Sequence, residues 1–186
     1  MKPGTSLRCG LPAVLAFLLA ASALAAREGL WLDVPYVHQE KDGCGSASVA
    51  MVMQYWAAKH APVAAERSDA SRIQRELYSR PAHGIYASAI ERYLRESGFQ
   101  VFAFRGEWKD LREHVAKGRP LILALKPSRG AALHYVVLVG LAPDDIGVLL
   151  NDPARSKLLN VPREEFADQW QRASDWTLLA LPKPVQ

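Results

Sequence analysis

The spacing of apolar residues changes near residue 99, and this change constrains the fold more than any other feature of the chain. Before it, small and apolar residues recur at helical spacing in three segments, at 44–59, 68–79 and 88–97. After it, short apolar runs separated by glycine and proline turns predict strands at 99–104, 120–125, 134–140, 148–152, 157–161 and 176–181, with helices at 109–117 and 162–171. Helices followed by mainly antiparallel hairpins indicate an α+β fold rather than a doubly wound one.

The first 26 residues have the three parts of a secretory leader. Lys2 and Arg8 form a positive start, an uncharged apolar run follows from 11 to 26, and 23–25 is a small-x-small cleavage pattern. The run is shorter than the roughly 20 residues that a membrane-spanning helix needs. We therefore predict a signal peptide at 1–26 and one domain at 27–186 that is periplasmic or secreted. The alternative is an uncleaved leader that anchors the domain to the membrane.

The charge of the predicted mature domain is nearly balanced. The whole chain has a formal net charge of +4, and removal of 1–26 leaves 21 basic against 19 acidic side chains. Neither this balance nor any block of basic residues suggests nucleic acid as a partner. The sequence has no His-x-x-x-His pair, no cluster of carboxylates and no glycine-rich phosphate loop, so we expect no metal and no cofactor.

Cys44 is the only cysteine of the predicted mature domain, because Cys9 lies in the leader. Structural cysteines of exported proteins usually occur in pairs, so a lone cysteine is either a buried inert residue or a reactive thiol. Cys44 stands between two glycines at the start of a predicted helix, where the partial positive charge favours a thiolate. This placement favours a thiol nucleophile. The side-chain amide of Gln39 and the backbone N–H of Cys44 would then be the donors for an oxyanion.

A thiol nucleophile needs a base, and the chain offers five histidines. We favour His134, because it opens a very apolar strand directly after a loop and so faces a cleft while the core holds it. The alternative is a core histidine bonded to a backbone carbonyl. His60, His83 and His114 have charged neighbours and are predicted to be solvated surface residues, and His38 lies on the segment that approaches Cys44.

Asp152 is the predicted partner of that base. A hairpin that pivots near 143–145 brings residues 134 and 152 roughly opposite each other, so the Asp152 carboxylate can fix the tautomer of the His134 ring. Asn151 is a second candidate for this role, although its side chain should point to the other face of the sheet. The alternative is that Asp152 and Pro153 only end the strand.

Together these residues resemble the bacteriocin-processing, double-glycine-leader cysteine peptidases, a papain-like family. The matching pieces are Val34-Pro35-Tyr36 with Gln39, the stretch 42–45, the strand 134–140, the stretch 151–153, and a later segment at 164–170. The resemblance spans about residues 31–181. It implies a papain-like fold with Cys44 as nucleophile, His134 as base, Asp152 as orienting residue and Gln39 as oxyanion donor.

The best-known members of that family are domains of ATP-driven exporters, whereas this chain looks like the free-standing exported relatives, some of which accompany secretion systems. We therefore expect an exported cysteine peptidase that cleaves a peptide or protein substrate without ATP, with secretion-system components as candidate partners. Two other functions stay open: a thiol acyltransferase, and a non-catalytic module that binds an export substrate. The loops at 80–87 and 126–133 are expected to border the cleft.

Overall fold

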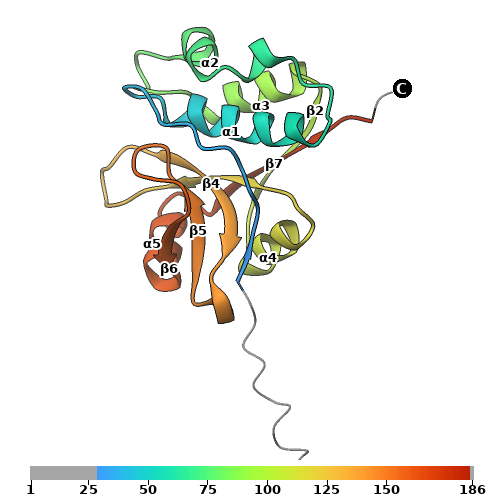
Figure 1. Cartoon of the computed structure of the whole chain (residues 1–186). Coiled ribbons are helices and arrows are strands. Elements are labelled where there is room, and N and C mark those ends of the chain that lie inside the picture. Colours follow the sequence, from blue (N-terminus) through green and yellow to red (C-terminus); the bar gives the residue numbers. More distant parts are fainter. Residues whose placement is uncertain (1–28, 185–186) are drawn as a thin grey trace, which may run out of the picture.

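The computed structural model describes residues 29–184, so the predicted leader at 1–26 lies outside the described residues. A layer of helices lies against a twisted antiparallel sheet, as Figure 1 shows. The helical layer contains α1 (Cys44–Ala58), α2 (Ala70–Leu77) and α3 (Ala87–Glu96), with a short 3₁₀ helix at Ala65–Ser68. Two further helices, α4 (Trp108–Ala116) and α5 (Arg163–Gln171), pack on the other face of the sheet.

Seven strands form the sheet in the described part of the chain, in the order β2-β7-β3-β4-β5-β6, with the short β1 paired to β4. Their bounds are Leu30–Trp31 (β1), Phe99–Arg105 (β2), Leu121–Leu125 (β3), His134–Leu141 (β4), Gly147–Asn151 (β5), Leu159–Pro162 (β6) and Trp176–Pro182 (β7). The predicted α+β class and its papain-like arrangement of helices and antiparallel sheet are confirmed.

The central strands are covered on both faces, which explains their continuous apolar runs. On β3, Ile122 and Ala124 belong to the core that includes α1 and α3, whereas Leu121 and Leu123 belong to the core that includes α4 and α5. Burial of each such leucine or isoleucine contributes about 1.5–3 kcal/mol. The sheet is therefore the shared wall of two cores.

The second predicted helix, at 68–79, is shorter than expected. The side chain of Asp69 accepts a hydrogen bond of 2.7 Å from the backbone N–H of Arg72, so Asp69 caps α2 and the helix begins at Ala70. The residues before it form the separate 3₁₀ turn. The other predicted elements are present, with ends shifted by a few residues.

A bulge in β4 sets the register of the hairpin that carries the site. Val137 pairs with Asn151, whereas Gly140 pairs with Leu149, so β4 contains one extra residue between the two pairs. Continuing the register would place Asp152 across from Val136. Residues 152 and 134, predicted to lie roughly opposite each other, are thus offset by two residues, but both side chains share one face of the sheet and meet at 2.7 Å.

The segment 32–43 connects β1 on the sheet to α1 in the helical layer, and Figure 1 shows it running from one layer to the other. Other bonds hold the layers together: the Tyr55 hydroxyl donates to the Gly118 carbonyl at 2.8 Å, and the Trp56 indole N–H donates to the Ala180 carbonyl at 3.0 Å. These two bonds therefore tie the C-terminal half of α1 to the rest of the protein.

Candidate active site

Cys44 is the first residue of α1, half-buried, and it is a free cysteine. The helix begins very close to its neighbours. A Cβ added to Gly45 would lie 3.2 Å from Ile85 Cβ and 3.5 Å from the Tyr135 ring. A glycine after Cys44 thus lets the first turn of α1 pack against β4 and against the predicted cleft loop at 80–87.

The His134 ring lies near both the Cys44 thiol and the Asp152 carboxylate. His134 is the first residue of β4, and its Nε2 lies 2.7 Å from Asp152 Oδ1. The side chain of Cys44 lies close enough to the ring to raise the pKa of His134. Because Nε2 is engaged by Asp152, Nδ1 is the nitrogen available to the sulfur. The structure therefore brings three of the predicted site residues, Cys44, His134 and Asp152, into one chain of contacts.

The charges of this chain of contacts support one another. Burial lowers the pKa of His134, but hydrogen bonds to Asp152 and Cys44, together with the charges of both, outweigh it and raise that pKa to about 9. Burial raises the pKa of Asp152, but the hydrogen bond to His134 and the charge of the imidazole outweigh it, so that pKa lies below its usual value. The arrangement therefore favours an imidazolium next to a carboxylate.

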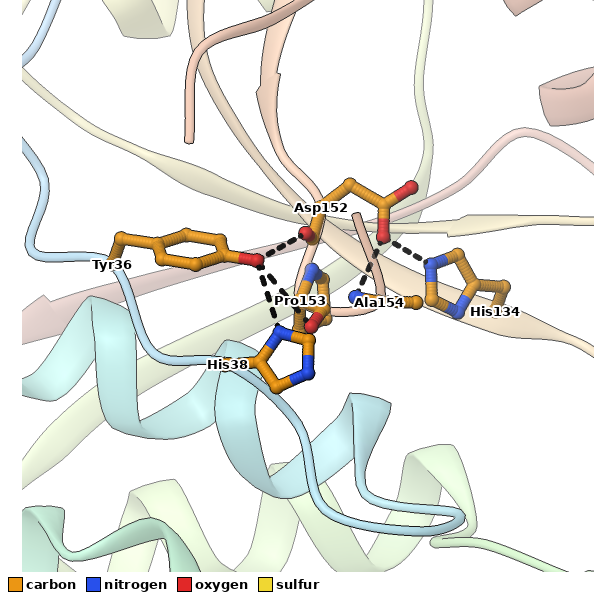
Figure 2. A network of polar contacts seen from close by, with 6 residues as sticks. All are labelled: Tyr36, His38, His134, Asp152, Pro153 and Ala154. Atoms are coloured by element: carbon orange, nitrogen blue, oxygen red, sulfur yellow. Dashed lines mark hydrogen bonds and ion pairs between the residues drawn. The ribbon is translucent and has the colours of Figure 1, made fainter. Parts of the chain in front are cut away.

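The Asp152 carboxylate is held in place by its own turn. Its side chain is only 7% exposed, and Oδ1 also accepts a hydrogen bond of 2.9 Å from the backbone N–H of Ala154. The backbone N–H of Asp152 donates to the Ser156 carbonyl. Figure 2 shows the carboxylate between the N–H of Ala154 and the ring of His134.

Asn151 holds two backbone segments in place instead of contacting His134. It is fully buried, its amide donates to the Val34 carbonyl at 3.1 Å, and its Oδ1 accepts from the backbone N–H of Leu158 at 3.0 Å. As expected from strand alternation, its side chain lies on the face away from the His134–Asp152 pair. Asn151 therefore does not orient the histidine.

Gln39 is tied to the segment that carries Asp152. Its backbone N–H donates to the Pro153 carbonyl at 2.9 Å. Its side-chain Oε1 is buried and has no hydrogen-bond partner among the described residues. Among the described residues, no hydrogen bond joins the Gln39 side chain to Cys44, so its role as oxyanion donor stays a prediction.

Sequence reasoning missed Tyr36 as a contributor. Its hydroxyl donates to the backbone carbonyl of Asp152 at 3.0 Å and lies 3.4 Å from that of Pro153, while His38 Nδ1 lies 3.5 Å away (Figure 2). Burial and then the charge of Asp152 raise the pKa of Tyr36. The hydroxyl therefore fixes the turn after β5 to the segment that leads to Cys44. The only signal for it was its place in the Val34-Pro35-Tyr36 piece.

Three further histidines were expected to be solvated. His60 and His83 are exposed, but His114 is half-buried, and its Nδ1 has no partner among the described residues. Burial, followed by the charge of Arg119, lowers the pKa of His114. The prediction was thus wrong for His114, because this residue flanks the buried side of α4 beside Leu111 and Val115.

A cavity of about 410 Å³ adjoins the site. His134 and Asp152 line it together with Pro127, Arg155 and Glu165. Pro127 belongs to the loop at 126–133, as expected for a loop that borders the site. In residues 29–184, no three His, Cys, Asp or Glu side chains gather into a group that could hold a metal ion. The helices of that same range are all too short or too polar to qualify as membrane spans.

Comparison with solved structures shows the same fold in several peptidase domains. A protein from Bacillus anthracis described as a C39-like peptidase aligns with a TM-score of 0.65 and 19% identity over 85% of this chain and 100% of that one. A double glycine motif protease from the AMS/PCAT transporter, solved with a leader peptide, aligns with a TM-score of 0.61 and 24% identity. The alignment covers 85% of this chain and 98% of that one. The peptidase domain of Streptococcus ComA, a bifunctional ABC transporter of a quorum-sensing pathway, aligns with a TM-score of 0.61 and 18% identity. The alignment covers 80% of this chain and 98% of that one.

Comparison with curated proteins found no match. The sequence itself matches the family described as Peptidase_C39 like over residues 31–177, a span that contains Cys44, His134, Asp152 and Gln39. Because this match spans most of the chain, the chain belongs to the C39-like peptidase family.

Proposed function

We propose that this protein is an exported thiol peptidase. Cys44 sulfur attacks the carbonyl carbon of a peptide bond, and the proton leaves with the amine by way of His134 as the C–N bond breaks. Water then attacks the thioester, which releases the carboxylic acid and restores the thiol. The observation that supports this reaction most directly is the imidazole of His134, which is bonded to the Asp152 carboxylate at Nε2 and lies close enough to the Cys44 side chain for that group to raise its pKa.

The supporting groups have distinct roles in this proposal. Asp152 orients the ring and stabilises its protonated form, since the carboxylate is buried and keeps its charge. The backbone N–H of Cys44 and the amide of Gln39 are the donors for the oxyanion. The cavity of about 410 Å³ beside His134 and Asp152 offers space for a substrate side chain.

The place of action and the partners rest on the sequence. The leader-like residues 1–26 support action in the periplasm or outside the cell, on a peptide or protein substrate and without ATP. Components of a secretion system are the partners that the family resemblance favours.

The proposal is tested by blocking the thiol in the chain that starts at Arg27, where Cys44 is the only cysteine. Incubation with a mixture of peptides is expected to give new amino termini, detected by mass spectrometry. Stoichiometric alkylation of Cys44 by iodoacetamide is expected to abolish them, because the carboxamidomethylated sulfur cannot attack. Alkylation should be fast at neutral pH, since Cys44 lies near the His134 ring, which a pKa of about 9 keeps protonated there.

Two outcomes would favour the other functions. Peptides joined to added amines, in place of free acids, would identify an acyltransferase. A module that only binds would give no products, and its alkylation would become fast only near pH 8–9, where an ordinary cysteine ionises.

The pKa of His134 predicts an alkaline limit. kcat/KM is expected to fall as the pH rises through about 9, because the imidazolium loses its proton there. Asp152→Asn removes the charge that raises this pKa, so the fall should move to lower pH. Asp33→Asn, which changes an exposed carboxylate paired with Lys157, should leave the pH at which kcat/KM falls unchanged. An unchanged alkaline limit in Asp152→Asn would contradict the assigned pair.

The raised pKa of His134 also makes the stability of the fold depend on pH. The folded-state pKa of His134 lies above the value of about 6.5 in an unfolded chain. Its protonated pairing therefore stabilises the fold fully below about pH 6.5, and this contribution is lost as the pH rises through about 9.

A further inference from the structure

The cavity of about 410 Å³ beside the candidate active site lies on the α5 face of the sheet. Its apolar walls belong to, or pack against, the core that includes α4 and α5, and they are formed by Leu125, Leu150, Leu159 and Val161. Cys44, by contrast, packs against the core that includes α1 and α3. His134 and Asp152 line the cavity, and the Cys44 side chain lies near the His134 ring. His134 therefore adjoins the thiol on one side and the cavity on the other.

The walls of this cavity are held in place by backbone hydrogen bonds. The N–H of Lys126 donates to the Gln169 carbonyl at 2.9 Å, and Arg172 Nε donates to the Lys126 carbonyl at 2.9 Å, so the loop at 126–133 starts from a firm attachment to α5. On the wall that carries Asp152, the backbone N–H of Asp152 donates to the Ser156 carbonyl at 3.0 Å. A preformed cavity of a few hundred Å³ is typical of a ligand site.

The charges around the cavity cancel. Arg155 and the His134 ring, whose pKa is about 9, are the cationic groups that line it at neutral pH, and Asp152 and Glu165 supply two carboxylates. Arg155, Glu165 and Pro127 are exposed, so the cavity is open to solvent. Since no net charge selects a cation or an anion, the apolar walls decide what the cavity binds. Burial of apolar surface is favourable there, whereas burial of an unpaired charge is costly.

The proposed reaction determines which part of a substrate meets this cavity. His134 gives its proton to the nitrogen of the leaving amine, so that nitrogen comes within hydrogen-bond reach of the ring. The acyl part of the substrate stays on the sulfur of Cys44, whereas the residue that carries the nitrogen lies over His134. Because His134 also lines the cavity, the side chain of that residue is the one placed beside it.

We propose that this cavity is the specificity pocket for the residue that directly follows the cleaved bond, and that it takes a large apolar side chain such as that of leucine, methionine or phenylalanine. This inference rests on the proposed function and deepens it, because it names the class of substrate. Full burial of such a side chain corresponds to a preference of about 10–100-fold in kcat/KM over glycine at the same position.

The first test varies one residue of a substrate. A bond that the intact protein cleaves in the peptide mixture supplies the parent peptide, and a series is made with glycine, leucine, phenylalanine, lysine or aspartate directly after that bond. Leucine and phenylalanine are expected to exceed the other three about 10–100-fold in kcat/KM. Equal rates for glycine and leucine, or a preference for lysine or aspartate, would overturn the inference.

Variants of the cavity should change this preference and nothing else. Gln169 is a half-buried cavity residue on α5, so Gln169→Trp fills the space while its carbonyl still accepts from Lys126. We expect kcat/KM to fall about 10-fold for the leucine peptide and to stay unchanged for the glycine peptide. Gln171→Trp is the control, because Gln171 is exposed on the same helix and lines a different cavity. Leu159→Ala, which removes a wall instead of filling the space, should also weaken the preference for leucine.

The same pocket can be probed in the reverse direction. When an amine replaces water, its nitrogen attacks the carbonyl carbon of the thioester, the C–S bond breaks, and the proton of the amine passes to sulfur by way of His134. Leucinamide is expected to capture the acyl group about 10-fold better than glycinamide, because its side chain enters the cavity. Gln169→Trp should remove this difference. Equal capture by the two amides in the intact protein would contradict the assigned pocket.

A methyl ester with the acyl part of the parent peptide separates this inference from the proposed function. Its leaving group is methanol, which has no side chain for the cavity, so the intact protein, Gln169→Trp and Gln171→Trp should hydrolyse it equally. Loss of ester hydrolysis in Gln169→Trp would show general damage and count against the pocket. If the intact protein hydrolyses neither the ester nor any peptide, the proposed function fails. If it hydrolyses both without distinguishing leucine from glycine, only this inference fails.

Discussion

Cys44→Ala is expected to abolish peptide hydrolysis, with a loss on the order of 10⁶-fold, the size seen when a peptidase loses its nucleophile. No other thiol can replace Cys44 in the chain that begins at Arg27. The fold should survive, because alanine is an excellent helix former and the residue is only half-buried at the start of α1. Initial rates of peptide cleavage, together with the thermal unfolding midpoint, measure both effects.

A matched control is available on the same helix. Ser48→Ala also removes one polar atom from α1, at a hydroxyl that is buried and has no hydrogen-bond partner among the described residues. It is expected to keep full activity. Hydrolysis that continues unchanged in Cys44→Ala would sink the peptidase proposal. Sequencing the amino termini of co-exported proteins, with the intact chain and with Cys44→Ala, would also identify natural substrates.

His134→Gln is expected to reduce hydrolysis by a similar factor, on the order of 10⁶-fold. Glutamine can still donate a hydrogen bond to the buried Asp152 carboxylate, which avoids leaving that charge unpaired. It cannot take a proton from sulfur or deliver one to the leaving amine. Alkylation of Cys44 at neutral pH should also slow, because the positive partner of the sulfur is gone. Steady-state rates and alkylation rates are measured on the same preparations.

His114→Gln serves as the control for this change. His114 is also half-buried, and it lies on α4, on the other side of the sheet from α1. Full activity in His114→Gln and none in His134→Gln is the expected pattern. Comparable losses in both variants would show that the effect of His134→Gln is structural rather than chemical.

Three of the candidate site residues could be singled out in the sequence because each one stands where an element begins or ends. Cys44 opens a helix, His134 opens a strand, and Asp152 directly follows one. Strand alternation was enough to put Asp152 and His134 on one face and Asn151 on the other. The contact between Cys44 and His134 was different, because it depends on how the helical layer packs on the sheet. Only the family resemblance indicated that packing.

Other features of the structure, namely the bulge in β4 and the long-range side-chain contacts, could not be predicted from the neighbouring sequence. The bulge in β4 lies next to Gly140, which pairs with β1 so closely that an added Cβ would lie 2.6 Å from the Leu30 carbonyl oxygen. The Tyr36 hydroxyl and the Asn151 amide reach their partners across long stretches of chain. The error at His114 was avoidable, because its distance of three residues from Leu111 puts it beside the buried stripe of α4.

The division of the reacting groups between two layers bears on how the protein is made. The sulfur belongs to the first long helix, whereas the ring and the carboxylate arrive with β4 and the turn after β5, late in the chain. An emerging or still extended polypeptide carries the thiol without its proposed base, so the proposed peptidase would be inert toward its neighbours at that stage. Its competence for cleavage would appear only when the last third of the molecule has docked, which would protect the cell that synthesises it.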